Sequence, residues 1–233
     1  HVFEIQLLGK NKKQESVCVR IHDFTPFFYV LIPSSWKKAD IESFVECLTK
    51  KAPSKEFLQW NVQQKRKFRG FTNQKKFNFI RFDFATKRAM NSWSRLFVRE
   101  KKTYVKDYDK LKLDQNVNPI DLFEKKRYPR SVREIIGNLN LPNQLVYSLL
   151  RNDDALTLYE SNLDPLLRFI HIQNIQPCEA VEIPIISKIK NKSDFVSYCD
   201  TEYQCTWKKV IAHQNSAPLY IPTHIACFDI ECT

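Results

Sequence analysis

The order of apolar and polar positions along the chain predicts an alternation of strands and helices. Two alternating segments flank a Lys- and Asn-rich turn near the start, which is the pattern of a β-hairpin. Apolar side chains then recur at spacings of three and four residues in two later segments, as on one face of a helix. Thr86 stands where a helix N-cap is expected. The pattern predicts strands over 1–9, 15–21, 26–33, 57–65 and 75–84, and helices over 39–51 and 86–98.

This order of elements favours an α+β fold. Strand, helix, strand, strand, helix needs one further strand to complete the split β-α-β sandwich on which RNA-recognition modules are built. Residues 155–160, ALTLYE, are predicted to supply that strand. The preceding residues, 107–154, are rich in Asn, Asp, Lys and Pro and show helical periodicity only over 143–150. They are expected to form a partly mobile insertion in a ferredoxin-like or RNA-recognition-like subdomain.

The rest of the chain predicts one more helix followed by strands. Asp164 is a suitable N-cap and Pro165 suits the first helical position. Strand character returns over 178–186, 202–213 and 220–233. The expected organisation is a hairpin at 1–26, an RNA-recognition-like subdomain at 27–160, a helix and strand-rich connection at 161–219, and a final strand at 220–233.

The net charge of +11 is concentrated in one segment. Residues 61–106 hold 14 Lys and Arg against only Asp83 and Glu100, whereas the remaining residues carry 23 basic and 24 acidic side chains. Such a segment can be a solvated face or a surface for a polyanion. Binding to a membrane surface would call for a basic amphipathic helix, and much of this segment is predicted to be strand. Nucleic acid is therefore the favoured partner.

The strand KKFNFIRF, residues 75–82, carries aromatic side chains within this basic segment. It agrees with the third-strand consensus of RNA-recognition modules at Lys75, Phe77, Phe79, Ile80 and Phe82, but Lys76 and Asn78 replace the Gly and the small residue. Phe77 and Phe79 share a face and could stack on bases, or could pack inside the protein. The candidate nucleic-acid-binding residues are Lys65, Arg66, Lys67, Arg69, Lys75, Lys76, Phe77, Phe79 and Arg81.

Two carboxylates near the C-terminus are candidates for metal binding. Asp229 and Glu231, in FDIEC, would lie on one face of a strand, about 6.5 to 7 Å apart along the backbone. Carboxylates so placed can share Mg²⁺ ions in two-metal phosphodiester chemistry, provided that further carboxylates converge on them. Asp200 and Glu202 have the same spacing but sit among polar residues, so we expect them at a solvated loop edge.

Other site classes find little support in the sequence. The seven cysteines are scattered without a C-x-x-C pair and are expected to be reduced thiols. With three glycines, the chain contains neither a phosphate-binding glycine loop nor a G-x-S-x-G nucleophile elbow. No apolar run has the length of a membrane span, and no N-terminal stretch has the pattern of a signal peptide.

Three stretches resemble the N-terminal region of family B replicative DNA polymerases, with delta-like enzymes as the nearest relatives. FDIEC resembles the first motif of their 3′–5′ proofreading exonuclease. RGFTNQKKFNFIRFDF, followed by SWSRLF at 92–97, resembles their G-F-T-N strand and helix, and LYESNLDPLLRFIHIQNI at 158–175 resembles the segment before the exonuclease. The segment 107–154 matches no part of the family pattern, and its Asn- and Lys-rich composition suggests a large DNA virus.

This resemblance implies an N-terminal, non-catalytic scaffold near nucleic acid, ending in the first strand of an RNase-H-like exonuclease. Asp229 and Glu231 would then be exonuclease carboxylates that bind Mg²⁺ only in the complete enzyme, so the chain alone is expected to be inactive. Expected partners are DNA, the rest of the polymerase polypeptide, and a sliding clamp or accessory subunits. The expected location is the nucleus or a viral replication compartment. The alternatives are a self-standing RNA- or single-stranded-DNA-binding module and a complete small nuclease.

Overall fold

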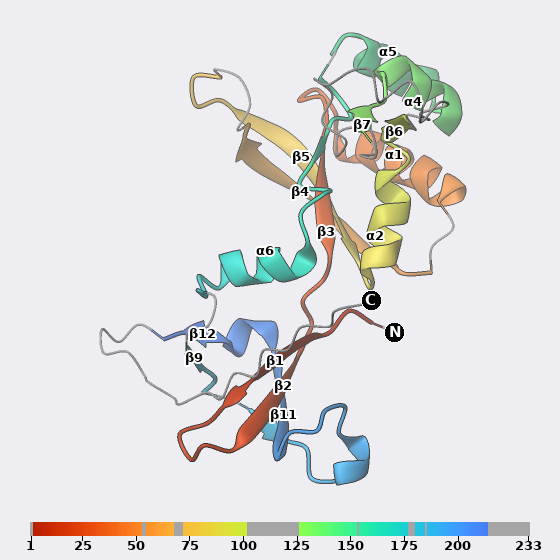
Figure 1. Ribbon diagram of the computed structural model, residues 1–233. Coiled ribbons are helices and arrows are strands. Elements are labelled where there is room, and N and C mark those ends of the chain that lie inside the picture. The colour runs from red at the N-terminus through yellow and green to blue at the C-terminus, as the bar shows by residue number, and fades with distance from the viewer. Residues whose placement is uncertain are drawn as a thin grey trace, which may run out of the picture. The chain divides into compact units, whose positions relative to one another are not determined.

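The computed structural model consists of two compact units, Thr25–Leu163 and His1–Phe24 with Asp164–Thr233 (Figure 1). The structure describes residues 2–52, 55–67, 72–101, 126–152, 154–176, 180–184 and 186–213. Each unit is built around its own four-stranded sheet.

The sheet of the 25–163 unit has the strand order β4-β5-β3-β8, and every neighbouring pair is antiparallel. Its strands and the two helices between them follow one another along the chain as strand, helix, strand, strand, helix, strand, the order that the sequence predicts. The last of these strands, β8, is only two residues long, because it pairs with β3 at just two positions. The elements are β3 (Phe27–Leu31), α1 (Lys38–Lys51), β4 (Phe57–Arg66), β5 (Lys76–Phe84), α2 (Lys87–Ser94) and β8 (Leu158–Tyr159).

Helices α1 and α2 pack on one face of this sheet (Figure 1). In β5, alternate side chains point to this face, among them Ile80, Phe82 and Phe84, and all three are fully buried. Trp93 of α2 stacks on Phe57 of β4 with ring centroids 4.7 Å apart. The apolar residues at helical spacing in α1 join the same core, as their periodicity predicts; they are Ile41, Phe44, Val45 and Leu48.

Helix α2 begins where the sequence predicts but ends four residues earlier. The Thr86 hydroxyl accepts a hydrogen bond from the Ala89 N–H at 3.1 Å and so satisfies one of the free donors of the first turn. After the helix, the chain enters β6 (Val98–Lys101), which pairs with β7 (Lys126–Pro129). Phe97 lies after the end of α2 but is buried in the same core. Its apolar side chain therefore continues the helical spacing of apolar residues in the sequence.

Replacing Thr86 with alanine is expected to lower the free energy of unfolding by about 0.5–2 kcal/mol, because the cap is lost. The Thr86 hydroxyl also donates to the Glu56 carboxylate at 2.6 Å, and that contact is lost as well. Urea denaturation measures the change. Thr86→Ser keeps the hydroxyl and is the matched control, so equal losses in the two variants would contradict the capping role.

The region predicted as a helix-poor insertion contributes two helices to the core. Helix α5 (Asn143–Leu150) confirms the predicted periodicity, but α4 (Val132–Leu139) was missed. The helix interior contains Gly137 and Asn138, which lower helix propensity, so packing rather than local preference decides this segment. Buried side chains from both helices and the turn between them enter the core of the unit; they are Ile135, Leu139, Leu141, Leu145 and Leu149. Within the predicted insertion at 107–154, residues 132–150 are therefore part of the core of this unit.

The second unit contains a sheet of order β1-β2-β11-β10, in which β2 and β11 run parallel. The predicted hairpin is confirmed as β1 and β2, and the predicted helix as α6, whose first turn is capped by Asp164 accepting from the Leu166 N–H at 2.8 Å. The Phe24 ring lies edge-on to Phe169 and Trp207 in the core. The elements are β1 (Ile5–Lys10), β2 (Ser16–His22), α6 (Pro165–Ile172), β9 (Val181–Glu182), β10 (Ser187–Lys188), β11 (Thr201–Thr206) and β12 (Ile211–Ala212). The strand predicted over 220–233 lies outside the described residues.

Candidate nucleic-acid interface

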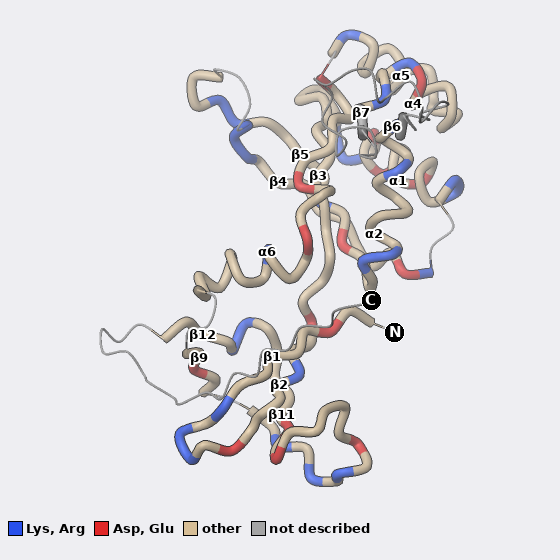
Figure 2. The backbone as a smooth tube through the Cα atoms, in the orientation of Figure 1, with Lys and Arg blue, Asp and Glu red and all other residues tan. Residues whose placement is uncertain are grey.

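The sheet face opposite α1 and α2 carries the aromatic and basic residues that the sequence singled out. Phe77, Phe79 and Arg81 alternate in β5 with the residues that enter the helix-covered core. In the neighbouring strand β4, Lys65 is paired with Phe77, and therefore shares its face. Figure 2 marks Lys and Arg in blue along this β4–β5 hairpin.

Phe79 is buried on this face and presents no open ring to a base. Its exposed fraction is 2%, and its ring contacts Tyr29 of β3 and Tyr159 of β8 in edge-on geometry, with centroids 6.4 and 5.1 Å away. The sequence leaves both packing and stacking open for this residue. The geometry favours packing, because the neighbouring tyrosines occupy the space that a base would need.

Phe77 lies among three lysines at the end of the hairpin. The ammonium of Lys67 is 4.3 Å from the centroid of the half-buried Phe77 ring, and that of Lys75 is 5.6 Å from it. Lys65, on the same face, places its ammonium 2.8 Å from the Tyr29 hydroxyl and 4.1 Å from the Tyr29 ring centroid. Positive charge beside an aromatic ring suits both the phosphates and the bases of a single strand.

Arg81 is committed to a neighbour within the protein. Its Nε and Nη2 donate to Oδ1 of Asp83 at 3.0 and 2.6 Å, and its guanidinium lies 3.6 Å from the Phe27 ring centroid. The Thr25 hydroxyl donates to the same carboxylate oxygen at 2.8 Å, and Asp83 is 1% exposed. Any phosphate contact by Arg81 would therefore compete with a buried carboxylate.

Two of the three remaining predicted contacts do not share this face. Arg66 and Lys76 are paired across β4 and β5 and point to the opposite side of the sheet from Lys65 and Phe77. Arg69 lies outside the described residues. The sequence did not single out Phe27, Tyr29 and Tyr159 as parts of this face. Strand β3 is apolar at every position, so its pattern does not indicate which side chains point to which side of the sheet.

The predicted metal ligands Asp229 and Glu231 lie outside the described residues. Within the described ranges, no group of three or more His, Cys, Asp or Glu side chains is placed to hold a metal ion. The four cysteines that the structure describes are free thiols, as expected, and burial raises the pKa of the Cys205 thiol. None of the helices described is both long enough and apolar enough to span a bilayer.

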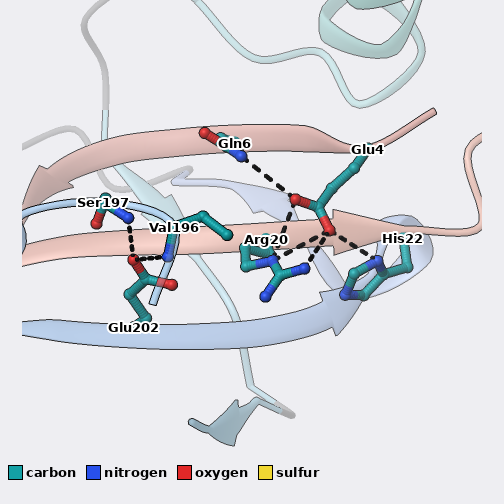
Figure 3. Close-up of polar contacts among 7 residues, drawn as sticks. All are labelled: Glu4, Gln6, Arg20, His22, Val196, Ser197 and Glu202. Atoms are coloured by element: carbon teal, nitrogen blue, oxygen red, sulfur yellow. Dashed lines mark hydrogen bonds and ion pairs between the residues drawn. The ribbon is translucent and has the colours of Figure 1, made fainter. Parts of the chain in front are cut away.

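The second Asp-x-Glu pair differs from its prediction at one residue. Asp200 is exposed, and its carboxylate accepts hydrogen bonds from the N–H and hydroxyl of Ser16 at 2.8 and 2.6 Å. Glu202 is instead fully buried, and Oε1 accepts from the N–H groups of Val196 and Ser197 at 2.9 and 2.6 Å (Figure 3). The expectation of a solvated loop edge is wrong for Glu202, because the chain upstream of β11 folds back to supply these donors.

Burial is the largest influence on the pKa of Glu202 and would raise it. Hydrogen bonds from Ser197 and Val196 and the charge of Arg20 act in the opposite direction, and the net result is a lowered pKa. Arg20 is in turn held by Glu4, whose carboxylate oxygens lie 3.1 Å from the Arg20 Nε (Figure 3). These contacts join β2 to the segment before β1, and β11 to the loop that precedes it.

The chain is similar to known DNA polymerases over nearly its whole length. The family model for the exonuclease domain of family B DNA polymerases matches residues 156–233. A DNA polymerase of Acanthamoeba polyphaga mimivirus is 28% identical over 99% of this chain, and the catalytic subunit of Arabidopsis thaliana DNA polymerase delta is 24% identical over 98%. The chain spans only 11% and 18% of the length of these two relatives.

By these matches, the chain is similar to one part of a family B DNA polymerase. The proteins to which the chain is similar include both viral DNA polymerases and delta catalytic subunits, and residues 156–233 match the exonuclease-domain model. A solved family B DNA polymerase from Pyrobaculum calidifontis aligns with a TM-score of 0.46 and 12% identity, covering 91% of this chain and 18% of that chain.

Proposed function

We propose that the chain is the N-terminal, non-catalytic part of a DNA-directed DNA polymerase with a 3′–5′ proofreading exonuclease. The alignment with polymerases over 98–99% of the chain carries this proposal. Asp229 and Glu231 would bind Mg²⁺ in the complete exonuclease, since carboxylates are the ligands that this cation prefers. Magnesium-dependent cleavage of DNA by the chain alone would contradict its non-catalytic role.

We further propose that residues 25–163 form a subdomain of the RNA-recognition type. The strand order β4-β5-β3-β8, with α1 and α2 packed on one face, supports this assignment. Such modules bind single strands on the opposite face through aromatic and basic side chains. The proposed partners are DNA and the rest of the polymerase polypeptide, with a sliding clamp or accessory subunits as further ones, at an intracellular site of replication.

Within this subdomain, we propose that the end of the β4–β5 hairpin contacts single-stranded DNA. The observation that supports it is the half-buried Phe77 ring beside the ammonium groups of Lys67 and Lys75, with Lys65 paired to Phe77 across the two strands. The ring would stack on a base while the lysines neutralise neighbouring phosphates. Phe79, being buried, would support the sheet rather than contact a base.

Replacing Phe77 with alanine is expected to weaken the binding of an oligo(dT) strand by about fivefold or more, because base stacking on an aromatic side chain contributes about 1–3 kcal/mol. Fluorescence anisotropy at low salt measures the affinity. Tyr147→Ala, which removes an aromatic ring that is 67% exposed on α5, is the matched control and should leave binding unchanged. Equal affinities of the Phe77 and Tyr147 variants would argue against this surface.

A further inference from the structure

The Lys67 side chain links the end of β4 to the turn that precedes β8. Its ammonium pairs with Asp154 Oδ2 at 2.7 Å while lying 4.3 Å from the centroid of the Phe77 ring. The two partners differ sharply in exposure, since the Lys67 side chain is 8% exposed and that of Asp154 is 71% exposed. A nearly buried cation is thus neutralised by a carboxylate that solvent, or a ligand, can reach.

Asp154 is held in position by the residues that follow it. Ala155 and Leu156 are 3% and 2% exposed, and the Leu156 N–H donates to the Leu31 carbonyl at 2.7 Å. The Thr157 hydroxyl donates to the Asp154 carbonyl at 2.8 Å. The backbone of the turn is therefore fixed to the sheet, and the Asp154 carboxylate lies within reach of the Lys67 ammonium.

We propose that Asp154 occupies the place of a nucleic-acid phosphate. It thereby keeps the Lys67 ammonium over the Phe77 ring until a single strand binds. This inference rests on the proposed binding of single-stranded DNA at Phe77. A backbone phosphate offers the Lys67 ammonium the same kind of charged oxygen as a carboxylate does. Lys67 has a flexible four-carbon stem, so its head can leave Asp154 for a phosphate and uncover the ring for a base. Asp154 thereby lowers the affinity of the surface for single strands.

Asp154→Asn removes the competing charge at nearly constant shape. We expect this variant to bind oligo(dT) about two- to fivefold more tightly, the range that corresponds to an ion pair with an exposed partner. Glu46→Gln is the matched control, because it removes an equal charge from the exposed Glu46–Lys50 pair on α1. A strand of abasic sites with the same number of phosphates separates stacking from charge, and the gain should be larger on oligo(dT) than on the abasic strand.

A second comparison tests the route through Lys67. In a Lys67→Ala background, Asp154→Asn should give no more gain than Glu46→Gln does, because the competing pair no longer exists. A gain that persists there, or that is equal on oligo(dT) and abasic strands, would overturn the inference. If Phe77→Ala leaves binding unchanged, the proposed binding surface itself fails. If Phe77→Ala weakens binding but Asp154→Asn has no effect, only the role of Asp154 fails.

Discussion

Leu149→Ala is expected to lower the free energy of unfolding by about 2–5 kcal/mol, the usual cost of emptying the space of a buried leucine. Leu149 is fully buried in the core that α4 and α5 share with the sheet. Helix α5 is further tied to the segment before α1 by the Trp36 indole N–H, which donates to the Ser148 hydroxyl at 2.6 Å. The loss should appear in the same cooperative transition as the unfolding of the sheet, measured by urea denaturation.

The adjacent residue provides the control for this experiment. Leu150 is 43% exposed, so Leu150→Ala removes the same atoms from the same helix while creating a much smaller cavity. We expect it to change stability by about 0.5 kcal/mol or less. Similar costs for the two variants, or a loss confined to a separate minor transition, would show that the 132–150 segment is not part of the core.

Glu202→Gln is expected to lower the free energy of unfolding by about 3 kcal/mol at neutral pH. The carboxylate accepts two hydrogen bonds in a fully buried place, and bonds to a charged acceptor contribute about 1.5–3 kcal/mol each. The glutamine also places a buried amide group where Oε2 has no hydrogen-bond partner among the described residues. Glu42→Gln, whose side chain is 53% exposed, should have little effect and is the control.

The effect of Glu202→Gln should also depend on pH. The pKa of Glu202 is lowered in the folded chain, so the carboxylate stabilises the fold above its unfolded pKa of about 4.3. That contribution is lost as the pH falls through the lower folded pKa, because both states then bind the proton. The stability difference between the wild type and Glu202→Gln should therefore shrink below about pH 4. A difference that stays constant from neutral to acidic pH would contradict a charged Glu202.

The two Asp-x-Glu motifs show that local spacing alone does not indicate whether a carboxylate is buried, exposed or bound to a metal. The two residues of each pair are separated by one residue. Glu202, however, is buried, and it accepts hydrogen bonds from N–H groups six and five residues upstream in a non-helical loop. Nothing in the periodicity of residues 195–202 indicates this return of the chain. The carboxylate is consequently a structural anchor, and the assignment of Asp229 and Glu231 as metal ligands stays a prediction.

The polymerase relationship could be recognised from sequence because its motifs are short, local and ordered along the chain. The same is true of the strands and helices with strong periodicity, such as α1 and β5, and of the caps at Thr86 and Asp164. These features depend on residues within one turn or one strand. The sequence alone therefore determined the strongly periodic strands and helices and the location of the basic segment.

Which side chains meet was decided only by the tertiary structure. Phe77 and Phe79 are equivalent in the pattern, yet Phe79 is enclosed by tyrosines from two other strands, whereas Phe77 lies among lysines. Asp154 reaches Lys67 from 87 residues away in the chain. Burial and ion pairing between distant segments depend on sheet order and packing, which local preference does not encode. The same packing makes a core helix of 132–139, where the sequence shows no clear helical periodicity.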